Sequence, residues 1–466
     1  MRHIVFTLLL CSLAKIASSQ AIDTVAQIDN IFSSWNNSTP GVSVLVARGE
    51  NIIYQKAFGL ADLERVVPIT TKTIFEAGSV SKQFTAFSIL LLESEGKLKL
   101  TDDVRKYIPE LPVYQAPITI QQLLNHTSGL KDWGSVGSLT GFPRGERNYT
   151  LDLGVHIICK QKTTNYIPGT EYNYSNSNYT LQVAIVERVS KQKFEDFTHE
   201  RIFKPLGMTS TRWRSNFRDV VPGRALAYSP KGNGMYELNM VFENIHGHGG
   251  LLTTTGDLLK WNRILETHQL GGDEIYKKRV ERGKLTNGEV IHYAAGLDYG
   301  DVNGAVVIGH TGSTAGYRAW LGYYPSKKIT VALLSNDGSF DSWWTGYQIA
   351  ELFFGKKPEE LPVAVEAKTD EDKEMTLKTG DQYIYDYSGR FYSDDAECYF
   401  TIKKKDDTLI AMDDALHEIP LTWQSQFVYD MNGREVKFQV DKKRNITGFT
   451  VSMGNAKNIP FKKITK

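Results

Sequence analysis

The stretch that decides the fold is FEAGSVSKQFTAFSILLLESEG, residues 75–96. Its apolar residues recur at helical spacing, at Phe84, Phe87, Leu90 and Leu91. Because glycine commonly ends a helix, we expect a helix from Ser79 to about Gly96. Ser79 and Lys82 then lie one turn apart on the same helix face. A partly buried lysine whose amine is neutral can take the proton of a neighbouring hydroxyl, so this pair is a candidate nucleophile and base.

The Ser-x-x-Lys spacing alone is weak evidence, because a serine and a lysine near a helix start are usually just a cap and a solvated charge. The pattern starts at five places: Ser12, Ser79, Ser94, Ser128 and Ser190. Ser12 lies in an apolar N-terminal segment, and Ser94 has its lysine beyond a glycine. Ser128 is in a predicted loop, and Ser190 is at a charged helix end. Only Ser79 begins a long apolar helix, which favours it.

Two further segments have the setting that a serine hydrolase needs. Tyr174-Ser175-Asn176 comes just before a helix predicted from about Asn178 to Ser190. Alternate residues of an extended segment point the same way, so Tyr174 and Asn176 can share one wall of a cleft. His310-Thr311-Gly312 closes a predicted strand, residues 305–308, and glycine there would let a substrate backbone lie along the strand edge.

Together these segments resemble the three signature elements of the serine β-lactamase and penicillin-binding-protein superfamily. The closest likeness is to the branch of class C β-lactamases, low-mass DD-peptidases, D-aminopeptidases and related esterases. It covers roughly residues 25 to 355 and extends to flanking segments: 75–78, 123–130 (LLNHTSGL), 168–169, 249–251 and 310–316.

The resemblance implies roles for the residues that match the motifs. Ser79 would be the acylated nucleophile, and Lys82 and Tyr174 would share the general-base and general-acid work; which of them takes the first proton stays open. The backbone N–H groups of Ser79 and Ser313 would form the oxyanion hole. Residues expected to bind substrate are Asn176, His310, Thr311, Gly312 and Ser313. No cofactor and no metal is expected.

One departure from the pattern concerns substrate choice. β-Lactamases usually begin the third motif with lysine, where this chain has His310. Histidine is mostly neutral near pH 7, so it attracts a substrate carboxylate less strongly than a permanently charged lysine does. This difference argues against a dedicated β-lactamase. A second match, Lys378-Thr379-Gly380, follows no strand pattern and is set aside. The pair in His246-Gly247-His248 lacks a third ligand, so it does not indicate a metal site.

The order of helical and strand patterns predicts the architecture. A hairpin over residues 41–54 and three strands at 305–308, 319–324 and 329–334 enclose a mainly helical region at about 119–270. We therefore expect an α+β fold of the β-lactamase/transpeptidase type in residues 20–355. In it, one antiparallel sheet built from both chain ends is flanked by helices and joined to an inserted helical subdomain.

The C-terminal part of the chain differs from the rest in composition and in its strand pattern. Residues 356–380 are charged and poor in apolar side chains, which indicates a linker. Residues 381–466 alternate short strands with turns and predict a small all-β domain. Because a charged linker usually joins units with few mutual contacts, this domain is expected to be separable.

The N-terminus predicts export. A basic start, an apolar run from Ile4 to Leu10 and small residues before Gln20 are typical of a signal peptide, residues 1–19, although a buried helix is the alternative. The run is too short to span a bilayer, which needs about 20 residues. Beyond it the chain has two cysteines, Cys159 and Cys398, which we interpret as buried thiols. A formal net charge of +1 gives no reason to expect nucleic acid or an anionic membrane surface as partner.

The sequence therefore predicts an exported (periplasmic or secreted) hydrolase that acts through an acyl-enzyme at Ser79 on D-amino-acid-containing peptides or amides. One alternative is a broad esterase or weak β-lactamase. Another, of a different class, is a non-catalytic protein that binds penicillin or peptidoglycan fragments. The expected partner is a small-molecule or peptide substrate, with no nucleic acid and no transmembrane anchor; the oligomeric state stays open.

Overall fold

A computed structural model describes residues 24–355 and 385–464. The predicted signal peptide, the linker and Lys378-Thr379-Gly380 lie outside these described residues. Within them, no helix combines the length and the apolar character that crossing a bilayer would require.

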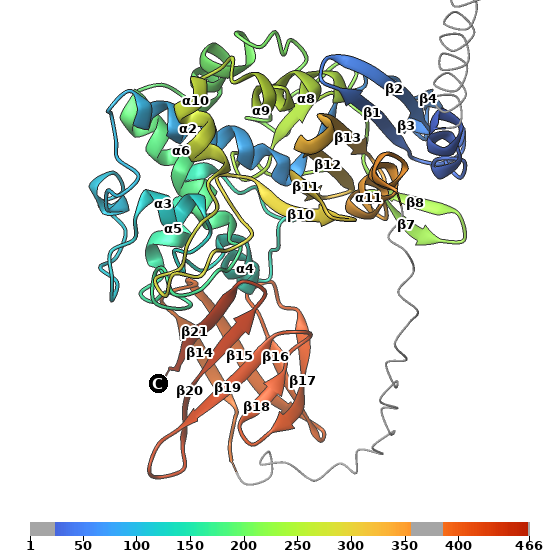
Figure 1. Cartoon of the computed structure of the whole chain (residues 1–466). Coiled ribbons are helices and arrows are strands. Elements are labelled where there is room, and N and C mark those ends of the chain that lie inside the picture. Colours follow the sequence, from blue (N-terminus) through green and yellow to red (C-terminus); the bar gives the residue numbers. More distant parts are fainter. Residues whose placement is uncertain (1–23, 356–384, 465–466) are drawn as a thin grey trace, which may run out of the picture.

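The centre of the fold is a six-stranded antiparallel sheet in the order β10-β11-β12-β13-β1-β2 (Figure 1). Its strands, in chain order, are β1 (Val42–Arg48), β2 (Asn51–Phe58), β10 (Asp298–Val302), β11 (Ala305–Thr314), β12 (Tyr317–Tyr324) and β13 (Ile329–Ser335). The N-terminal hairpin joins the C-terminal strands where β1 pairs with β13, with Val42 opposite Ser335. The prediction of one sheet built from both chain ends is confirmed.

Both faces of this sheet are covered by helices, so its central strands are apolar on both sides. On one face, Val42, Val44 and Val46 pack with Ile349 and Ala350 of α11 (Ser342–Phe354). On the other face, side chains such as Leu45 and Ala47 join the core of the helical region. The alternation along β1 thus assigns successive residues to two cores.

The helical region is organised around α2 (Lys82–Ser94), which is buried from Lys82 to Leu92 and contacts α6 (Asn176–Ser190) and α10 (Gly272–Val280). The other helices are α3 (Ile120–Leu124), α4 (Trp133–Gly137), α5 (Leu151–Lys160), α7 (Phe194–Thr198), α8 (Thr255–Asn262) and α9 (Ile264–Thr267). The short strands outside the central sheet and before α11 are β3 (Leu60–Asp62), β4 (Val67–Pro68), β5 (Phe75–Glu76), β6 (Arg212–Trp213), β7 (Tyr228–Gly232), β8 (Met235–Leu238) and β9 (Leu251–Thr253).

The predicted C-terminal β domain is a closed barrel of the strands β14 to β21. These are β14 (Gly389–Ser393), β15 (Cys398–Lys405), β16 (Thr408–Met412), β17 (Glu418–Ser425), β18 (Val428–Asp430), β19 (Glu435–Val440), β20 (Ile446–Met453) and β21 (Ala456–Lys463). Closure pairs the first strand with the last and leaves no unpaired edge. Cys398 is buried in the barrel, whereas Cys159 is partly exposed, and both thiols are free.

The barrel is docked against the helical region, beside α4 and α5 (Figure 1). Val136 and Leu139 belong to the apolar core of the barrel. The turn between β20 and β21 also reaches the helical region, because the backbone N–H of Asp132 donates to the carbonyl of Asn455 at 3.1 Å. Our expectation of few contacts between the two parts was therefore wrong, since a linker's composition carries no information about the surfaces that it joins.

We predict that a chain ending at Gly355 is markedly less stable than the full chain. Removing the barrel would expose Val136 and Leu139, which are 1% and 0% exposed in the full chain. Burial of each such side chain is worth about 1.5–3 kcal/mol. The midpoint of thermal unfolding should fall, and labelling of Ser79 by a serine-directed probe should slow because Asp132 loses a backbone partner. An unchanged midpoint together with unchanged labelling would contradict this prediction.

Candidate active site

Ser79 lies in a 3-10 turn, Gly78–Ser81, and α2 begins only at Lys82. The helix that we expected to start at Ser79 therefore starts three residues later. The turn lies directly against β11. A Cβ on Gly78, whose φ is +50°, would be 2.6 Å from the backbone nitrogen of Ser313, and one on Gly312 would be 2.0 Å from the carbonyl oxygen of Ala77. Only glycines permit this approach, which brings the Ser79 backbone beside the end of β11.

The side chain of Lys82 lies in the centre of the site and is fully buried. Its Nζ is 3.1 Å from Ser79 Oγ, 2.9 Å from Asn176 Oδ1 and 2.7 Å from the carbonyl oxygen of His248. Burial holds the pKa of Lys82 well below its usual range, and although the charge of Asp132 acts in the opposite direction, it does not offset burial. A neutral amine has two N–H groups for the amide and carbonyl oxygens, which leaves its lone pair for the Ser79 hydroxyl.

Tyr174 covers the same amine, with its ring centroid 4.8 Å from Lys82 Nζ. Burial raises the pKa of the Tyr174 hydroxyl well above its usual range, and a side-chain hydrogen bond with Ser79 acts the other way without offsetting burial. The phenol therefore holds its proton near neutral pH. Beside a lysine whose pKa is lowered, this arrangement suits a tyrosine that donates a proton and a lysine that accepts one.

Asn176 is the first residue of α6, which fixes its position. Its backbone N–H donates to Asp132 Oδ2 at 2.8 Å, and its side-chain oxygen accepts from Lys82. Since the amide oxygen is used in this way, the Nδ2 group is left as a donor. Such a donor suits the carbonyl oxygen of a substrate amide.

His310 is 4% exposed and lies inside β11, which continues to Thr314, whereas the predicted strand covered only residues 305–308. Its Nδ1 is 2.6 Å from the carbonyl oxygen of Thr311, and its Nε2 is 2.9 Å from the hydroxyl of Tyr293. A carbonyl only accepts, so Nδ1 carries the proton and Nε2 accepts from Tyr293. Both ring nitrogens thus have partners inside the protein. Burial, with the nearby Lys82, lowers the pKa of His310 to about 3.

We predict that His310 contributes no ionisation to the pH dependence of activity between about pH 5 and 9. Because its pKa is lowered to about 3, the imidazole is already neutral across that range. The acid limb of a kcat/KM profile should therefore have the same midpoint in the parent and in His310→Gln, even if the rates differ. A limb that moves or disappears in the variant would show that His310 titrates during catalysis.

The last residues of β11 form an open strand edge. Pairing with β10 ends where Asp298 lies opposite Gly309, whereas pairing with β12 continues to Thr314. The segment 310–314 therefore has no strand on its outer side among the described residues, and Thr311 and Ser313 are exposed. Such an edge offers backbone donors and acceptors to an extended substrate, next to the Ser79 turn.

The structure thus brings together all the predicted site residues, and it adds neighbours that the sequence did not single out for this site. Asp132 fixes Asn176, the His248 carbonyl accepts from Lys82, and Tyr293 holds His310. His248 belongs to the His-Gly-His segment considered only as a metal site. Among the described residues, no three histidine, cysteine or acidic side chains are grouped as metal ligands.

Ser128 and His126, in the segment 123–130, make structural contacts beneath the catalytic residues. Both are buried. Ser128 Oγ donates to Asn178 Oδ1 at 2.5 Å, and Asn178 Nδ2 is 2.9 Å from His126 Nδ1. The ring of His126 packs 4.3 Å from the ring of Tyr174, between centroids. These residues support the base of the site.

Several known proteins are similar to this chain in sequence or in fold. The sequence profile of the β-lactamase family matches residues 22–342. Penicillin-binding protein 4* of Bacillus subtilis is 31% identical over 63% of this chain and 67% of its own length. A D-aminopeptidase of Cereibacter sphaeroides is 28% identical over 64% of this chain, which spans only 57% of that relative.

Two solved structures are also similar. The octameric penicillin-binding protein homologue from Pyrococcus abyssi has a TM-score of 0.61 and 25% identity, over 94% of this chain and 98% of that one. The D-amino acid amidase of Ochrobactrum anthropi has a TM-score of 0.59 and 20% identity, over 71% of this chain and 98% of that one, which is a likeness of fold. With the profile match and the first relative, these findings show that this chain belongs to the β-lactamase family of serine hydrolases.

Proposed function

We propose that this protein is an exported hydrolase that forms an acyl-enzyme at Ser79 and acts on peptides or amides containing D-amino acids. The observation that carries the proposal is the buried Lys82 amine, 3.1 Å from Ser79 Oγ, with its pKa held low by burial. A neutral amine at this distance is positioned to activate the hydroxyl.

In the proposed acylation, Lys82 takes the proton of Ser79 while Oγ forms a bond to the substrate carbonyl carbon. The carbonyl oxygen becomes an oxyanion and accepts from the backbone N–H groups of Ser79 and Ser313. The carbon–nitrogen bond then breaks. Tyr174 gives its proton to the leaving amine, and the proton held by Lys82 passes to the tyrosine oxygen.

Deacylation uses the same groups. Lys82 takes a proton from a water molecule whose oxygen attacks the ester carbonyl carbon, and the oxyanion is held as before. The ester bond to Ser79 Oγ breaks, Lys82 returns its proton to Ser79 Oγ, and the carboxylic acid product gives its own proton to water and leaves as a carboxylate. No group outside the chain and the water is needed to balance either step.

The choice of substrate rests on two supports. The relatives include enzymes named for D-amino acid substrates, a D-aminopeptidase and a D-amino acid amidase. In addition, the third motif carries a neutral His310 whose nitrogens both have internal partners, so it gives a β-lactam carboxylate no charged donor. Export rests on the N-terminal sequence pattern alone.

A substrate panel tests the proposal directly. The purified protein and its Ser79→Ala variant would be assayed with a D-alanyl peptide amide, its L-enantiomer, a chromogenic cephalosporin and a short p-nitrophenyl ester. We expect turnover of the D-peptide amide in excess of the L-form, with none in the variant. Faster turnover of the ester than of any peptide would favour the esterase alternative. Stoichiometric labelling without turnover would favour a penicillin-binding protein without enzymatic activity.

A further inference from the structure

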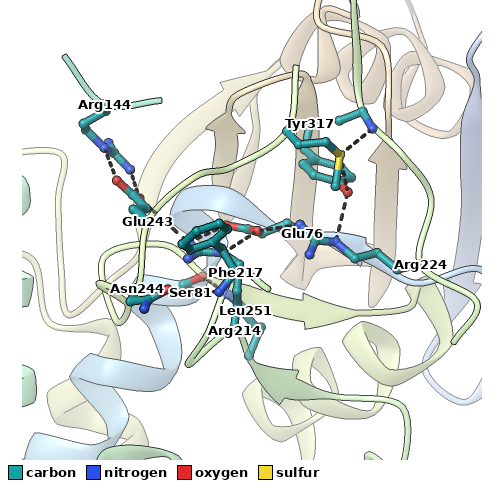
Figure 2. Close-up of polar contacts among 12 residues, drawn as sticks. Glu76, Ser81, Arg144, Arg214, Phe217, Arg224, Glu243, Asn244, Leu251 and Tyr317 are labelled. Atoms are coloured by element: carbon teal, nitrogen blue, oxygen red, sulfur yellow. Dashed lines mark hydrogen bonds and ion pairs between the residues drawn. The ribbon is translucent and has the colours of Figure 1, made fainter. Parts of the chain in front are cut away.

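A buried arginine, Arg214, joins two carboxylates beside the active site (Figure 2). Its Nε and Nη2 donate to the two carboxylate oxygens of Glu76, at 3.0 and 3.2 Å. Nη2 also lies 3.7 Å from Oε1 of Glu243. All three side chains are at most 3% exposed. Arg214 thus links a carboxylate three residues before Ser79 to another that lies five residues before His248.

The backbone around Arg214 connects the same segments. Arg214 directly follows β6, and β9 lies between β6 and β5, the strand that carries Glu76. The Arg214 side chain therefore reaches across β9. Its backbone N–H donates to the carbonyl of Gly250 at 2.8 Å, and the N–H of Leu251 donates to Oγ of Ser81 at 3.1 Å. Arg214 and β9 together fix where the segment 243–250 lies relative to the Ser79 turn.

The segment 243–250 reaches the catalytic amine through its backbone. The carbonyl of His248 accepts from Lys82 Nζ at 2.7 Å, and the carbonyl of Gly247 accepts from Thr85 Oγ at 2.7 Å. Lys82 and Thr85 both belong to α2, which begins at the end of the Ser79 turn. The distance between the Lys82 amine and this carbonyl therefore depends on how the segment is held against the turn.

We propose that Arg214 is a positioning residue: by bridging the two carboxylates, it holds the carbonyl of His248 at the Lys82 amine. This inference rests on the proposed acyl transfer at Ser79 and adds a residue, outside the site, on which that reaction depends. Without the bridge, the segment would loosen and water would reach the amine. Hydration favours the charged ammonium, so a higher pH would be needed before Lys82 could act as a base.

A second arginine, Arg224, supplies a matched control. Its Nη2 lies 3.3 Å from Oε2 of Glu76, and its side chain is 9% exposed. Its Nε donates to the hydroxyl of Tyr317 at 3.1 Å (Figure 2). Within the described part of the chain, no residue of the segment 243–250 forms a hydrogen bond or an ion pair with Arg224. Arg224 thus shares the Glu76 carboxylate with Arg214 but does not reach the segment.

Neither replacement leaves a buried carboxylate unpaired. Glu76 keeps one arginine in Arg214→Met and in Arg224→Met, and Glu243 keeps Arg144, which donates to it from Nε at 2.8 Å. Both variants should therefore fold, with a lowered midpoint of thermal unfolding. Because Arg214→Met also removes a charge, Arg214→Lys is included. Lysine keeps the charge but lacks the planar fork that spans two carboxylates.

The other charged and titratable groups around the Lys82 amine are identical in the parent and in all three variants. They lie on several elements and are Asp132, Arg144, Tyr174, Tyr179, His126, His248 and His310. A change in the pH dependence that is common to Arg214→Met and Arg214→Lys therefore reports the position of the segment 243–250.

The test measures the rate of labelling of Ser79 by a fluorophosphonate as a function of pH. Arg214→Met and Arg214→Lys should lower the rate near neutral pH about ten- to hundredfold, the scale of a misplaced catalytic group. In both, the acid limb should move to higher pH, whereas Arg224→Met should keep the parent's rate and limb. An unmoved limb, a shift confined to Arg214→Met, or an equal shift in Arg224→Met would overturn the proposal and leave Arg214 as a structural support.

NMR titration of the Lys82 amine separates this proposal from the proposed function, because it needs no substrate. In protein with isotope-labelled lysine side chains, the Lys82 signal is identified by its loss in Lys82→Ala. The pKa of Lys82 should rise in Arg214→Lys and stay unchanged in Arg224→Met. If Ser79 is not labelled in the parent but this difference is present, the acyl-transfer proposal fails and the role of Arg214 stands. If Ser79 reacts but the pKa is the same in all variants, the role of Arg214 is overturned and the acyl transfer stands.

Discussion

Replacing Ser79 with alanine should abolish both hydrolysis and labelling by fluorophosphonate or fluorescent penicillin. Loss of the nucleophile removes the atom that forms the acyl bond, and the other catalytic groups cannot replace it. Such losses typically exceed about a thousandfold in kcat. The side chain makes few contacts that the fold needs, so the variant should keep its thermal midpoint. Intact-protein mass spectrometry after incubation with probe would report the covalent adduct.

Ser128→Ala is the matched control for this result, because Ser128 also has a lysine three residues later. Its hydroxyl is buried and donates to Asn178. Removing it should cost about 1–3 kcal/mol of stability and leave labelling at Ser79 intact. A labelled Ser79→Ala variant, or an adduct mapped to Ser128 or Ser190, would move the nucleophile elsewhere.

Much of the site could be predicted from the local spacing of residues. Helical periodicity after Ser79 placed the serine and Lys82 together, and alternation in an extended segment put Tyr174 and Asn176 on one wall. Those inferences need only contacts within a few residues, where backbone geometry is nearly constant. The strands were predictable for the same reason, since short apolar runs separated by turns are themselves local patterns. That the strands of both chain ends form one sheet was inferred from the order of helical and strand patterns along the chain.

Contacts between distant segments were not predictable in this way. The hydrogen bond from Asn176 to Asp132, the hydrogen bond from Lys82 to the carbonyl oxygen of His248 and the docking of the barrel on Val136 each join segments with no shared pattern. The late start of α2 has the same origin, because the Ser79 turn follows a left-handed Gly78 that allows it to approach β11. Charged groups such as Arg144 look like surface residues until the fold supplies their partners.

Replacing Lys82 with alanine should lower kcat/KM by a hundredfold or more, the scale of general acid–base catalysis. The pH dependence should change as well. Because the pKa of Lys82 is lowered by burial, the base becomes competent as the pH rises through a value below the ordinary lysine range. The parent should therefore show an acid limb that disappears in Lys82→Ala, while residual activity no longer follows that ionisation.

Tyr174→Phe separates the two proton-transfer roles, because it removes only the hydroxyl and retains the ring over Lys82. It should also reduce turnover of an amide by a hundredfold or more, since an amine leaves only when it is protonated. With a p-nitrophenyl ester, whose leaving group needs no proton, the loss should be much smaller, whereas Lys82→Ala should impair both substrates. Circular dichroism must show both variants folded, because Lys82 also donates to Asn176 and to the carbonyl of His248. Equal losses with amide and ester in a folded Tyr174→Phe variant would mean that Tyr174 takes the first proton and that Lys82 assists it.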